Sequence, residues 1–355
     1  MNSTTPNTTP LRDWPKRLAR AVLARGALYA LARSRALSGG AITILMYHTL
    51  GRDDEAFDAW TVVRRTDFLR QVDWLRRHYA VLSLDDALGG RGREHALPPA
   101  VITFDDGEAG LHEHLLPIVE SEQLPVTVYV ATGQIETGRP YWFDRVMNAT
   151  QVAASTMLDL AEIGLGRWAL EAAAGQRAWC AIGDLLDRLK GLAPAARESA
   201  TARIEAVLAA AARRTVTPLA PLPLVQLRAL AASRWVTIGA HTHDHDLLDR
   251  MPLAEACASI ERSRRLLCEW TGCVIEHFAY PNGNHDDALV REVERLGFRS
   301  AMATGKGLWR PGDGRFAMPR VPVGRYDDLD KFKLDLLGGV RTAFAPRHVG
   351  PGQPT

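Results

Sequence analysis

The sequence predicts a (β/α) barrel of irregular or incomplete form. Apolar runs rich in β-branched residues alternate with segments of helical periodicity, polar side chains gather where the apolar runs stop, and 355 residues suit one such domain with insertions. The connection between the third and fourth runs is short and the next one is long, so the barrel is expected to be irregular.

Eight apolar runs are expected to form the strands of this barrel. They lie at 41–48, 78–84, 99–106, 125–132, 235–243, 276–283, 298–305 and 315–323. Helical periodicity between them is clearest at 66–78, 253–270 and 286–297. Because functional side chains of such barrels lie at the carboxyl ends of strands, the ends of these runs are candidate sites of chemistry.

The chain is expected to divide into a basic helical extension (1–40), a main domain (41–325) and a C-terminal segment (326–355). Inside the main domain, residues 150–214 are rich in Ala and Leu with few β-branched runs, which predicts an insertion of two or three helices. The first ten residues and the last fourteen are rich in Pro, Gly and Thr, and we expect them to be disordered.

The N-terminal extension has a strong charge bias. Its one acidic residue is Asp13, and its basic residues are Arg12, Lys16, Arg17, Arg20, Arg25, Arg33 and Arg35. One side of a helical wheel holds Leu11, Trp14, Leu18, Val22 and Tyr29. Two interpretations stay open: peripheral contact with an anionic membrane surface, or a helix that packs on the main domain.

The composition argues against several classes of protein. With 43 basic and 41 acidic residues the formal net charge is +2, so no nucleic-acid partner is expected. Four cysteines without CxxC spacing indicate reduced, mostly buried thiols. Since no apolar stretch resembles an export signal or a membrane span, the protein is expected in the cytoplasm, including the inner face of the membrane.

The segment GAHTHDHDLL places three histidines in five residues. On a helical turn His241 and His245, four residues apart, would point in similar directions and could bind one ion, whereas His243 would point away. Two imidazoles with a carboxylate from elsewhere suit Zn²⁺ or a similar divalent ion. The alternative is a solvated polar helix start, and this segment by itself does not choose between the two.

A pair of aspartates ends the apolar run VITFDDG. A hydrolytic metal site needs one carboxylate that binds the ion and a second that accepts a proton from water. Asp106 could therefore bind metal while Asp105 faces the water, with Gly107 allowing a tight turn. Taken alone, Asp-Asp-Gly is also common turn chemistry.

Taken together, these motifs resemble those of the polysaccharide deacetylases, the NodB-homology or carbohydrate esterase family 4 enzymes. The resemblance rests on TFDDG (103–107), HTHDH (241–245) and FAYPNG (278–283), in the family's order, with support from LMYHTL (45–50), YWFDRV (141–146) and MPRVPV (318–323). It covers about residues 41–325. It leaves the two ends and the inner insertion unexplained.

The resemblance implies a role for each matching residue. Asp105 would be the general base, and Asp106, His241 and His245 would bind a divalent metal, with zinc the expected ion. The reaction implied is hydrolysis of an N-acetyl group on an amino sugar. The ion would polarise the carbonyl and activate the water, and backbone N–H groups in the turn formed by Tyr280, Pro281, Asn282 and Gly283 would share the oxyanion charge.

Two departures from the family pattern lead to further assignments. Many members carry an arginine in the third motif that holds the base; here Ala279 stands there, and we expect Arg320 to replace it. Many members take the leaving-group acid from a late histidine, but here the last one is His348, near the C-terminus. Relatives with FAYPxG in the third motif use the histidine of a first-strand YH pair instead, which is His48 in this sequence.

The sequence thus predicts a metal-dependent deacetylase whose substrate is an N-acetylated glycan or lipid-linked saccharide. Trp142, with Asp144, could line the sugar site, although an aromatic residue at the start of an insertion is as often part of a core. His285 and Asp286 fit the start of the following helix better. The alternatives are a carbohydrate O-acetyl esterase and a non-catalytic carbohydrate-binding protein. The sugar, the native metal, the role of the insertion and the oligomeric state stay open.

Overall fold

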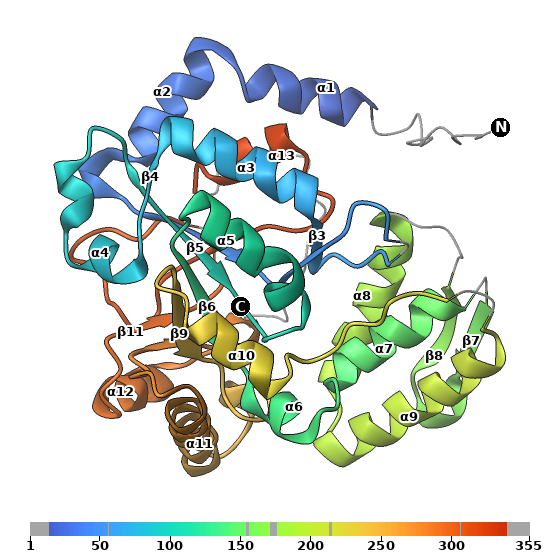
Figure 1. The fold of residues 1–355 in the computed structure, drawn as a ribbon. Helices are drawn as coiled ribbons and strands as arrows, with labels where there is room; N and C mark the ends of the chain where they lie inside the picture. The colour runs from blue at the N-terminus through green and yellow to red at the C-terminus, as the bar shows by residue number, and fades with distance from the viewer. Residues whose placement is uncertain are drawn as a thin grey trace.

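Eight parallel strands form one curled sheet at the centre of the molecule (Figure 1). The structure, a computed structural model, describes residues 14–55, 57–153, 156–170, 176–212, 215–305 and 307–338. The strands are β1 (Thr43–Tyr47), β4 (Ala80–Val81), β5 (Pro99–Phe104), β6 (Val126–Val130), β9 (Val236–Ala240), β10 (His277–Ala279), β11 (Ser300–Met302) and β12 (Val321–Pro322). Each lies within one of the eight predicted runs, and the predicted irregular barrel is confirmed.

The sheet runs in the order β11-β10-β9-β6-β5-β1-β12, with β4 beside the start of β5. Segment 315–323 brings the two edges together. On one side its Met318 N–H donates to the carbonyl of Ala301, and on the other side the Val323 N–H donates to the carbonyl of Met46. Strand β12 is short because proline has no N–H for the ladder.

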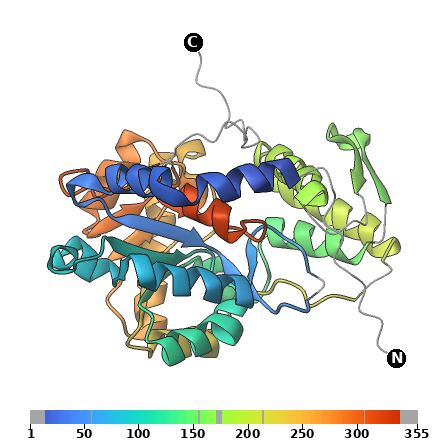
Figure 2. The same ribbon diagram turned by 90° about the horizontal axis from the view of Figure 1, so that it is seen from above.

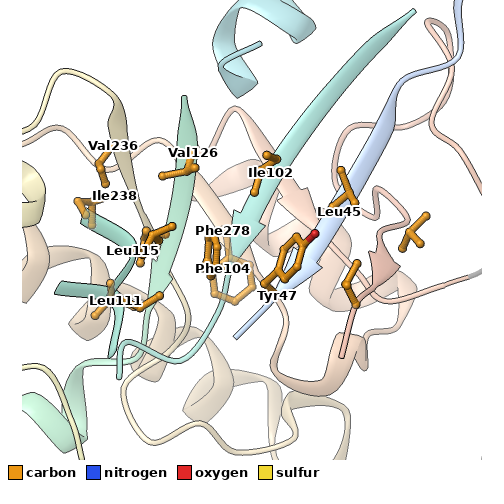
Figure 3. Close-up of a cluster of buried hydrophobic side chains, with 14 of the residues drawn as sticks. Leu45, Tyr47, Ile102, Phe104, Leu111, Leu115, Val126, Val236, Ile238 and Phe278 are labelled. Carbon is orange, nitrogen blue, oxygen red and sulfur yellow. The ribbon is translucent and has the colours of Figure 1, made fainter. Parts of the chain in front are cut away.

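Both faces of the sheet are covered, which explains why its strands are continuous apolar runs. On β1 and β5 the side chains of Leu45, Tyr47, Ile102 and Phe104 face the outer helices, where they meet Leu111 and Leu115 (Figure 3). The alternate residues face the interior of the curl, which α4 (Leu84–Leu88) helps to fill. By this alternation the residue after β5, Asp105, faces the interior.

The remaining helices of the main domain surround the sheet. They are α3 (Arg65–His78), α5 (Leu116–Glu122), α6 (Thr132–Thr137), α10 (Leu224–Ala231), α11 (Leu253–Thr271), α12 (Asp287–Arg295) and α13 (Leu329–Asp335). Asp286 caps α12 by accepting a hydrogen bond from the Leu289 N–H, as predicted for the start of that helix. Strands β2 (Thr49–Gly51) and β3 (Val62–Arg64) form a separate parallel pair.

Short helical turns complete the main domain. These are η1 (Ser38–Gly40), η2 (Arg91–Glu94), the π-helical η3 (Leu111–Leu115), η5 (Leu248–Arg250) and η6 (Pro281–Gly283).

The four cysteines form no disulfide, as predicted. Cys180 is exposed and the other three are only half-buried, so the prediction of mostly buried thiols is wrong.

The segment between β6 and β9 has a core of its own, built from residues such as Met147, Leu185 and Ile204. It comprises α7 (Trp142–Val152), β7 (Thr156–Leu160), η4 (Ala161–Ile163), β8 (Gly166–Leu170), α8 (Gln176–Lys190) and α9 (Pro194–Ala210). The predicted helical insertion therefore also holds an antiparallel hairpin of β7 and β8. Its first helix begins before residue 150.

Two helices, α1 (Trp14–Leu23) and α2 (Gly26–Ala36), lie along the outside of the main domain, with α1 beside α13 (Figures 1 and 2). The helical conformation is interrupted between α1 and α2, and Gly26 has φ 77°. The prediction that these apolar residues share one side of a helix is therefore wrong. Leu18 and Val22 are exposed, whereas the Tyr29 hydroxyl donates to the carbonyl of Lys333. Leu11 and His348 lie outside the described residues. Among the described helices, none has the length and apolar character needed to cross a bilayer.

Candidate active site

Asp105 and Asp106 follow β5 directly at the carboxyl end of the sheet. Both are buried, although carboxylates seldom are. Asp105 continues the inward-facing positions of the strand, and Asp106 adopts φ 74°, a left-handed conformation that turns the chain. The two neighbouring carboxylates therefore point in different directions and have different partners.

Asp105 forms a bidentate ion pair with Arg320. The two guanidinium nitrogens lie 2.7 and 2.6 Å from the two carboxylate oxygens, and Arg320 also donates to the hydroxyl of Thr103 and the carbonyl of Ala303. Arg320 is fully buried, which makes it the largest enclosed side chain described. Its fork holds the plane of the Asp105 carboxylate.

The interior of the curl is shaped to admit this arginine. The guanidinium lies 5.5 Å from the ring centre of Tyr129 on β6. Tyr129 itself fits because its neighbour across the sheet is Gly239, where an added Cβ would lie 2.5 Å from the tyrosine ring. A side chain at position 239 would thus displace Tyr129.

The Arg320 pair also determines the charge of Asp105. Burial acts to raise the pKa of this carboxyl, but the positive charge of Arg320, with a contribution from His241, outweighs it and lowers the pKa below its usual value. Asp105 is therefore held as a carboxylate. Because a carboxylate can accept about four hydrogen bonds, the two from Arg320 leave capacity for a water molecule.

Asp106, His241 and His245 converge on one point. The same oxygen of Asp106 lies 3.4 Å from Nε2 of His241 and 3.1 Å from Nε2 of His245. Ligand atoms of the three residues lie within 4.8 Å of one another. At metal–ligand bond lengths of about 2.0–2.2 Å, a single ion can be reached by all three.

His241 is held in the orientation that metal ligation needs. It follows β9, and its Nδ1–H donates to the carbonyl of Ala279 at 2.7 Å. This bond leaves the lone pair of Nε2 directed toward Asp106. Burial acts to lower the pKa of His241, but Asp105 and Asp106 outweigh burial and raise the pKa. The two carboxylates therefore favour a positive charge at Nε2 of His241.

Asp106 has no Arg or Lys partner among the described residues; its ion pairs are with the two histidines. Burial acts to raise its pKa, but His245 and His241 outweigh burial and hold the pKa well below its usual range. The negative charge of Asp106 is therefore balanced by the imidazoles alone. Such a buried carboxylate is suited to a bound metal cation.

The helical turn predicted for the two histidines is wrong. After His241 the chain is irregular, with left-handed residues at Thr242 (φ 64°) and His245 (φ 55°), and the hydroxyl of Thr242 accepts a hydrogen bond from the His245 N–H. This compact turn brings the imidazoles to a ring-centre separation of 4.9 Å. His243 points away, as predicted, with Nδ1 2.8 Å from the hydroxyl of Thr132.

His48 follows β1, the strand beside β5, and its ring lies edge-on to Trp60. Nδ1 has no hydrogen-bond partner within the described parts of the chain. Burial lowers the pKa of His48 below its usual value, assisted by Arg320 and opposed by Asp106 and Asp105. The charges of both aspartates and of Arg320 therefore act on His48.

The third motif forms the tight turn η6 between β10 and α12. Gly283 has φ 77° and lies against the backbone of Thr304, where an added Cβ would clash at 2.3 Å. The Tyr280 N–H donates to the Met302 carbonyl, and the Gly283 N–H donates to the Tyr280 carbonyl. Since Pro281 has no N–H, only Asn282 of the four predicted residues could offer an oxyanion a backbone donor.

The aromatic residues of YWFDRV divide between two roles. Phe143 and Tyr141 face the ring of His245, with ring centres 4.9 and 5.7 Å away, and the Tyr141 hydroxyl donates to the carbonyl of His243. Trp142 and Phe143 both pack against the core of the insertion, and Trp142 also lies under the guanidinium of Arg197. The sequence prediction named Trp142 and missed its two neighbours.

The sequence also gave no sign of a second buried acid pair near Asp106. Glu108 and Asp144 are buried, and both oxygens of Glu108 and one of Asp144 lack a partner in the described residues. Burial, followed by the charges of neighbouring acids, raises the pKa of both carboxyls well above the usual range. Their neutral forms are favoured, so Asp106 remains the acid that attracts a cation.

Part of the chain matches a known protein family. Residues 199–301 match the model of the polysaccharide deacetylase family. None of the curated proteins compared with the chain matches it.

Several solved deacetylases share the fold. The deacetylase PplD from Streptococcus pyogenes, solved in complex with acetate, is 16% identical and aligns over 83% of this chain and 98% of its own, with a TM-score of 0.54. IcaB from Ammonifex degensii is 18% identical over 84% of this chain and 97% of its own, with a TM-score of 0.53. A de-N-acetylase from Aggregatibacter actinomycetemcomitans is 16% identical over 83% and 99%, with a TM-score of 0.51. The chain therefore has the fold of these deacetylases, and its segment with His241 and His245 matches the polysaccharide deacetylase family.

Proposed function

We propose that the protein is a metal-dependent hydrolase that removes N-acetyl groups from amino sugars of a polysaccharide or a lipid-linked saccharide. One observation carries the proposal: an arginine-held carboxylate, Asp105, stands directly beside the convergence of Asp106, His241 and His245. The fold and the family-model match support the same class of reaction. On FAYPNG we assign the chain to the subgroup with FAYPxG in the third motif.

The three converging residues suit a divalent metal ion. Two imidazole nitrogens and one carboxylate oxygen form the mixed donor set of hydrolytic zinc sites, and zinc is the ion we propose. The Ala279 carbonyl fixes the tautomer of His241, as ligand-orienting groups do in such sites. When bound, the ion supplies Lewis acidity that polarises the acyl oxygen and lowers the pKa of a water molecule.

Asp105 is the general base of the proposed reaction. It takes a proton from the water whose oxygen adds to the amide carbonyl carbon. Arg320 is a positioning residue, because it contacts neither water nor substrate in this scheme but fixes the carboxylate plane through two hydrogen bonds.

His48 is the proposed acid. As the carbon–nitrogen bond breaks, an imidazolium at this position gives a proton to the leaving nitrogen, so that acetate and a free amine result. The charges of both aspartates act to raise its pKa, although burial outweighs them and leaves the pKa below its usual value. In the third motif, the Asn282 N–H is the candidate oxyanion donor. At the sugar site, Tyr141 and Phe143 replace Trp142 as our candidate lining residues.

The test is acetate release by purified protein, stripped of metal and reconstituted with zinc, from a panel of N-acetylated amino sugars that includes N-acetylglucosamine oligomers. We expect release that is lost on metal removal, restored by zinc and abolished in Asp105→Asn. Absence of release from every N-acetylated sugar would contradict the proposal.

The same assay distinguishes the two alternative functions. Release from O-acetylated xylan without release from N-acetylated sugars would identify an O-acetyl esterase. Sugar binding without release from either class would identify a non-catalytic carbohydrate-binding protein. The second outcome would be hard to reconcile with the presence of both aspartates and both histidines.

A further inference from the structure

Helices α1 and α2 contact the main domain along one side only. Ala24, Tyr29 and Ala32 pack against Leu334 and Leu337 at the end of α13 and beyond it. The outward side of the two helices is left uncovered by the described residues (Figure 2).

That outward side collects exposed apolar side chains. Of the eleven large hydrophobic residues that are exposed in the described structure, five lie within 14 residues of sequence, from 48% exposed at Leu23 to 80% at Leu28. These five are Leu18, Val22, Leu23, Leu28 and Leu31. The remaining six are spread from residue 97 to residue 274, so the concentration on α1 and α2 is specific to this face.

The same two helices are strongly basic. Residues 14–36 contain six Lys or Arg and no Asp or Glu, whereas the whole chain has a net charge of +2, so the rest of the chain carries a net charge of −4. Three of these arginines contact the domain: Arg20 lies 3.8 Å from Asp328, Arg25 lies 3.5 Å from Asp330, and Arg33 donates to the carbonyl of His78. The Arg25 side chain is still 70% exposed, and Arg35 is exposed as well.

The combination of exposed apolar residues with concentrated positive charge selects among possible partners. A second copy of this chain, docked face to face, would bring two faces with an excess of basic residues together, which opposes association. An anionic lipid surface offers the opposite charge to the arginines and an apolar layer to the leucines. The two helices have 10 and 11 residues, which is enough to lie in the interface but too few to cross it.

We propose that α1 and α2 dock the protein on an anionic membrane surface, with Val22, Leu28 and their apolar neighbours inserted among the lipid headgroups. This goes beyond the proposed function, because docking requires none of the site residues. It would bring the enzyme to lipid-linked saccharides, whose carriers lie in the same surface.

The experiment is co-sedimentation of the full chain with vesicles of phosphatidylcholine, with or without about a third phosphatidylglycerol. We expect binding to the anionic vesicles, at least tenfold weaker binding to the neutral ones, and release by high salt. Val22→Glu combined with Leu28→Glu should weaken binding at least tenfold. The matched control is Val225→Glu with Val274→Glu, since these residues are equally exposed but lie on α10 and after α11, and it should bind as the native chain does.

Other outcomes would overturn the docking proposal. These are failure to bind anionic vesicles, equal binding to both vesicle types, or equal loss in the control variant. A native dimer that Val22→Glu with Leu28→Glu dissociates would show a protein interface instead. Thermal unfolding and acetate release in solution should be unchanged in all variants, so that failure of docking and failure of the deacetylase proposal are separate results.

Discussion

Two groups of potential metal ligands lie at opposite ends of the same sheet, and they differ in how the charge of their acids is balanced. Asp106, His241 and His245 lie at the carboxyl ends of the strands, and Asp85, Glu276 and His277 lie near the amino ends of β10 and β11. In each group a buried histidine places Nε2 3.4 Å from an aspartate oxygen. In each, Nδ1 has a partner: the carbonyl of Ala279, or the hydroxyl of Ser300.

The difference is the cation that balances the acids. Near the amino ends, Nη1 of Arg299 lies 2.5 Å from Asp85 and 2.9 Å from Glu276, so the protein supplies its own positive charge. At the carboxyl ends Arg320 is bound to Asp105 and does not pair with Asp106. Proximity of ligand atoms is thus common to both groups. The absence of an Arg or Lys partner for Asp106 among the described residues distinguishes the one we propose as the metal site.

The largest effect should follow removal of a proposed ligand. In His241→Ala we expect loss of the bound zinc and loss of acetate release to background, because two remaining ligands bind an ion weakly. Elemental analysis after dialysis and the acetate assay measure both. His243→Ala is the matched control from the same segment, since its imidazole points toward Thr132, and it should keep the ion. Retention of zinc by His241→Ala would contradict the assignment.

The next largest effect should come from the base. Asp105→Asn keeps the shape of the side chain but cannot accept the proton, so we expect acetate release to fall by about 10²–10⁴-fold. The ion should be retained, because Asp105 is not one of the three converging residues. Simultaneous loss of zinc and activity in this variant would mean that Asp105 is a ligand. Activity that remains near the native level would remove it from the reaction.

A smaller effect on activity, with a large effect on stability, is expected for Arg320. Arg320→Ala leaves Asp105 buried without its partner, so the free energy of unfolding should fall by about 3–5 kcal/mol. Denaturant unfolding measures this. The double variant Arg320→Ala with Asp105→Asn removes both charges and should lose less than the sum of the two single variants. Additive losses would show that the bidentate pair contributes little energy.

The sequence predicted the strands well and the local backbone poorly. All eight apolar runs contain strands because their two faces are buried, which leaves a continuous apolar pattern. The hairpin Thr156–Leu160 with Gly166–Leu170 was missed, since its strands mix polar and apolar residues. The left-handed residues Thr242 and His245 were missed because a β-branched Thr rarely adopts that conformation and a His does so in only a minority of cases, so the surrounding structure must impose it.

For the site, sequence motifs indicated which residues meet but not how they are supported. The contact of Arg320 with Asp105 was expected only through the resemblance, because 215 residues separate the two in sequence. The burial of Glu108 and Asp144 had no signal, since acids are usually exposed. The roles of Asp105, His48 and the three proposed ligands stay predictions until the variants are measured.

The smallest expected effect tests the comparison of the two groups most directly. If an internal cation is what keeps zinc from the group near the amino ends, Arg299→Ala should allow a second, weaker ion to bind to Asp85, Glu276 and His277. Zinc titration followed by elemental analysis would show it. Acetate release should not change, because Arg299 contacts Asp85 and Glu276 rather than any proposed site residue. The double variant with His277→Ala removes the buried imidazole and should bind a single ion again. A native protein that already binds two ions would show that the guanidinium does not exclude metal, and the balance of charge would then no longer separate one group from the other.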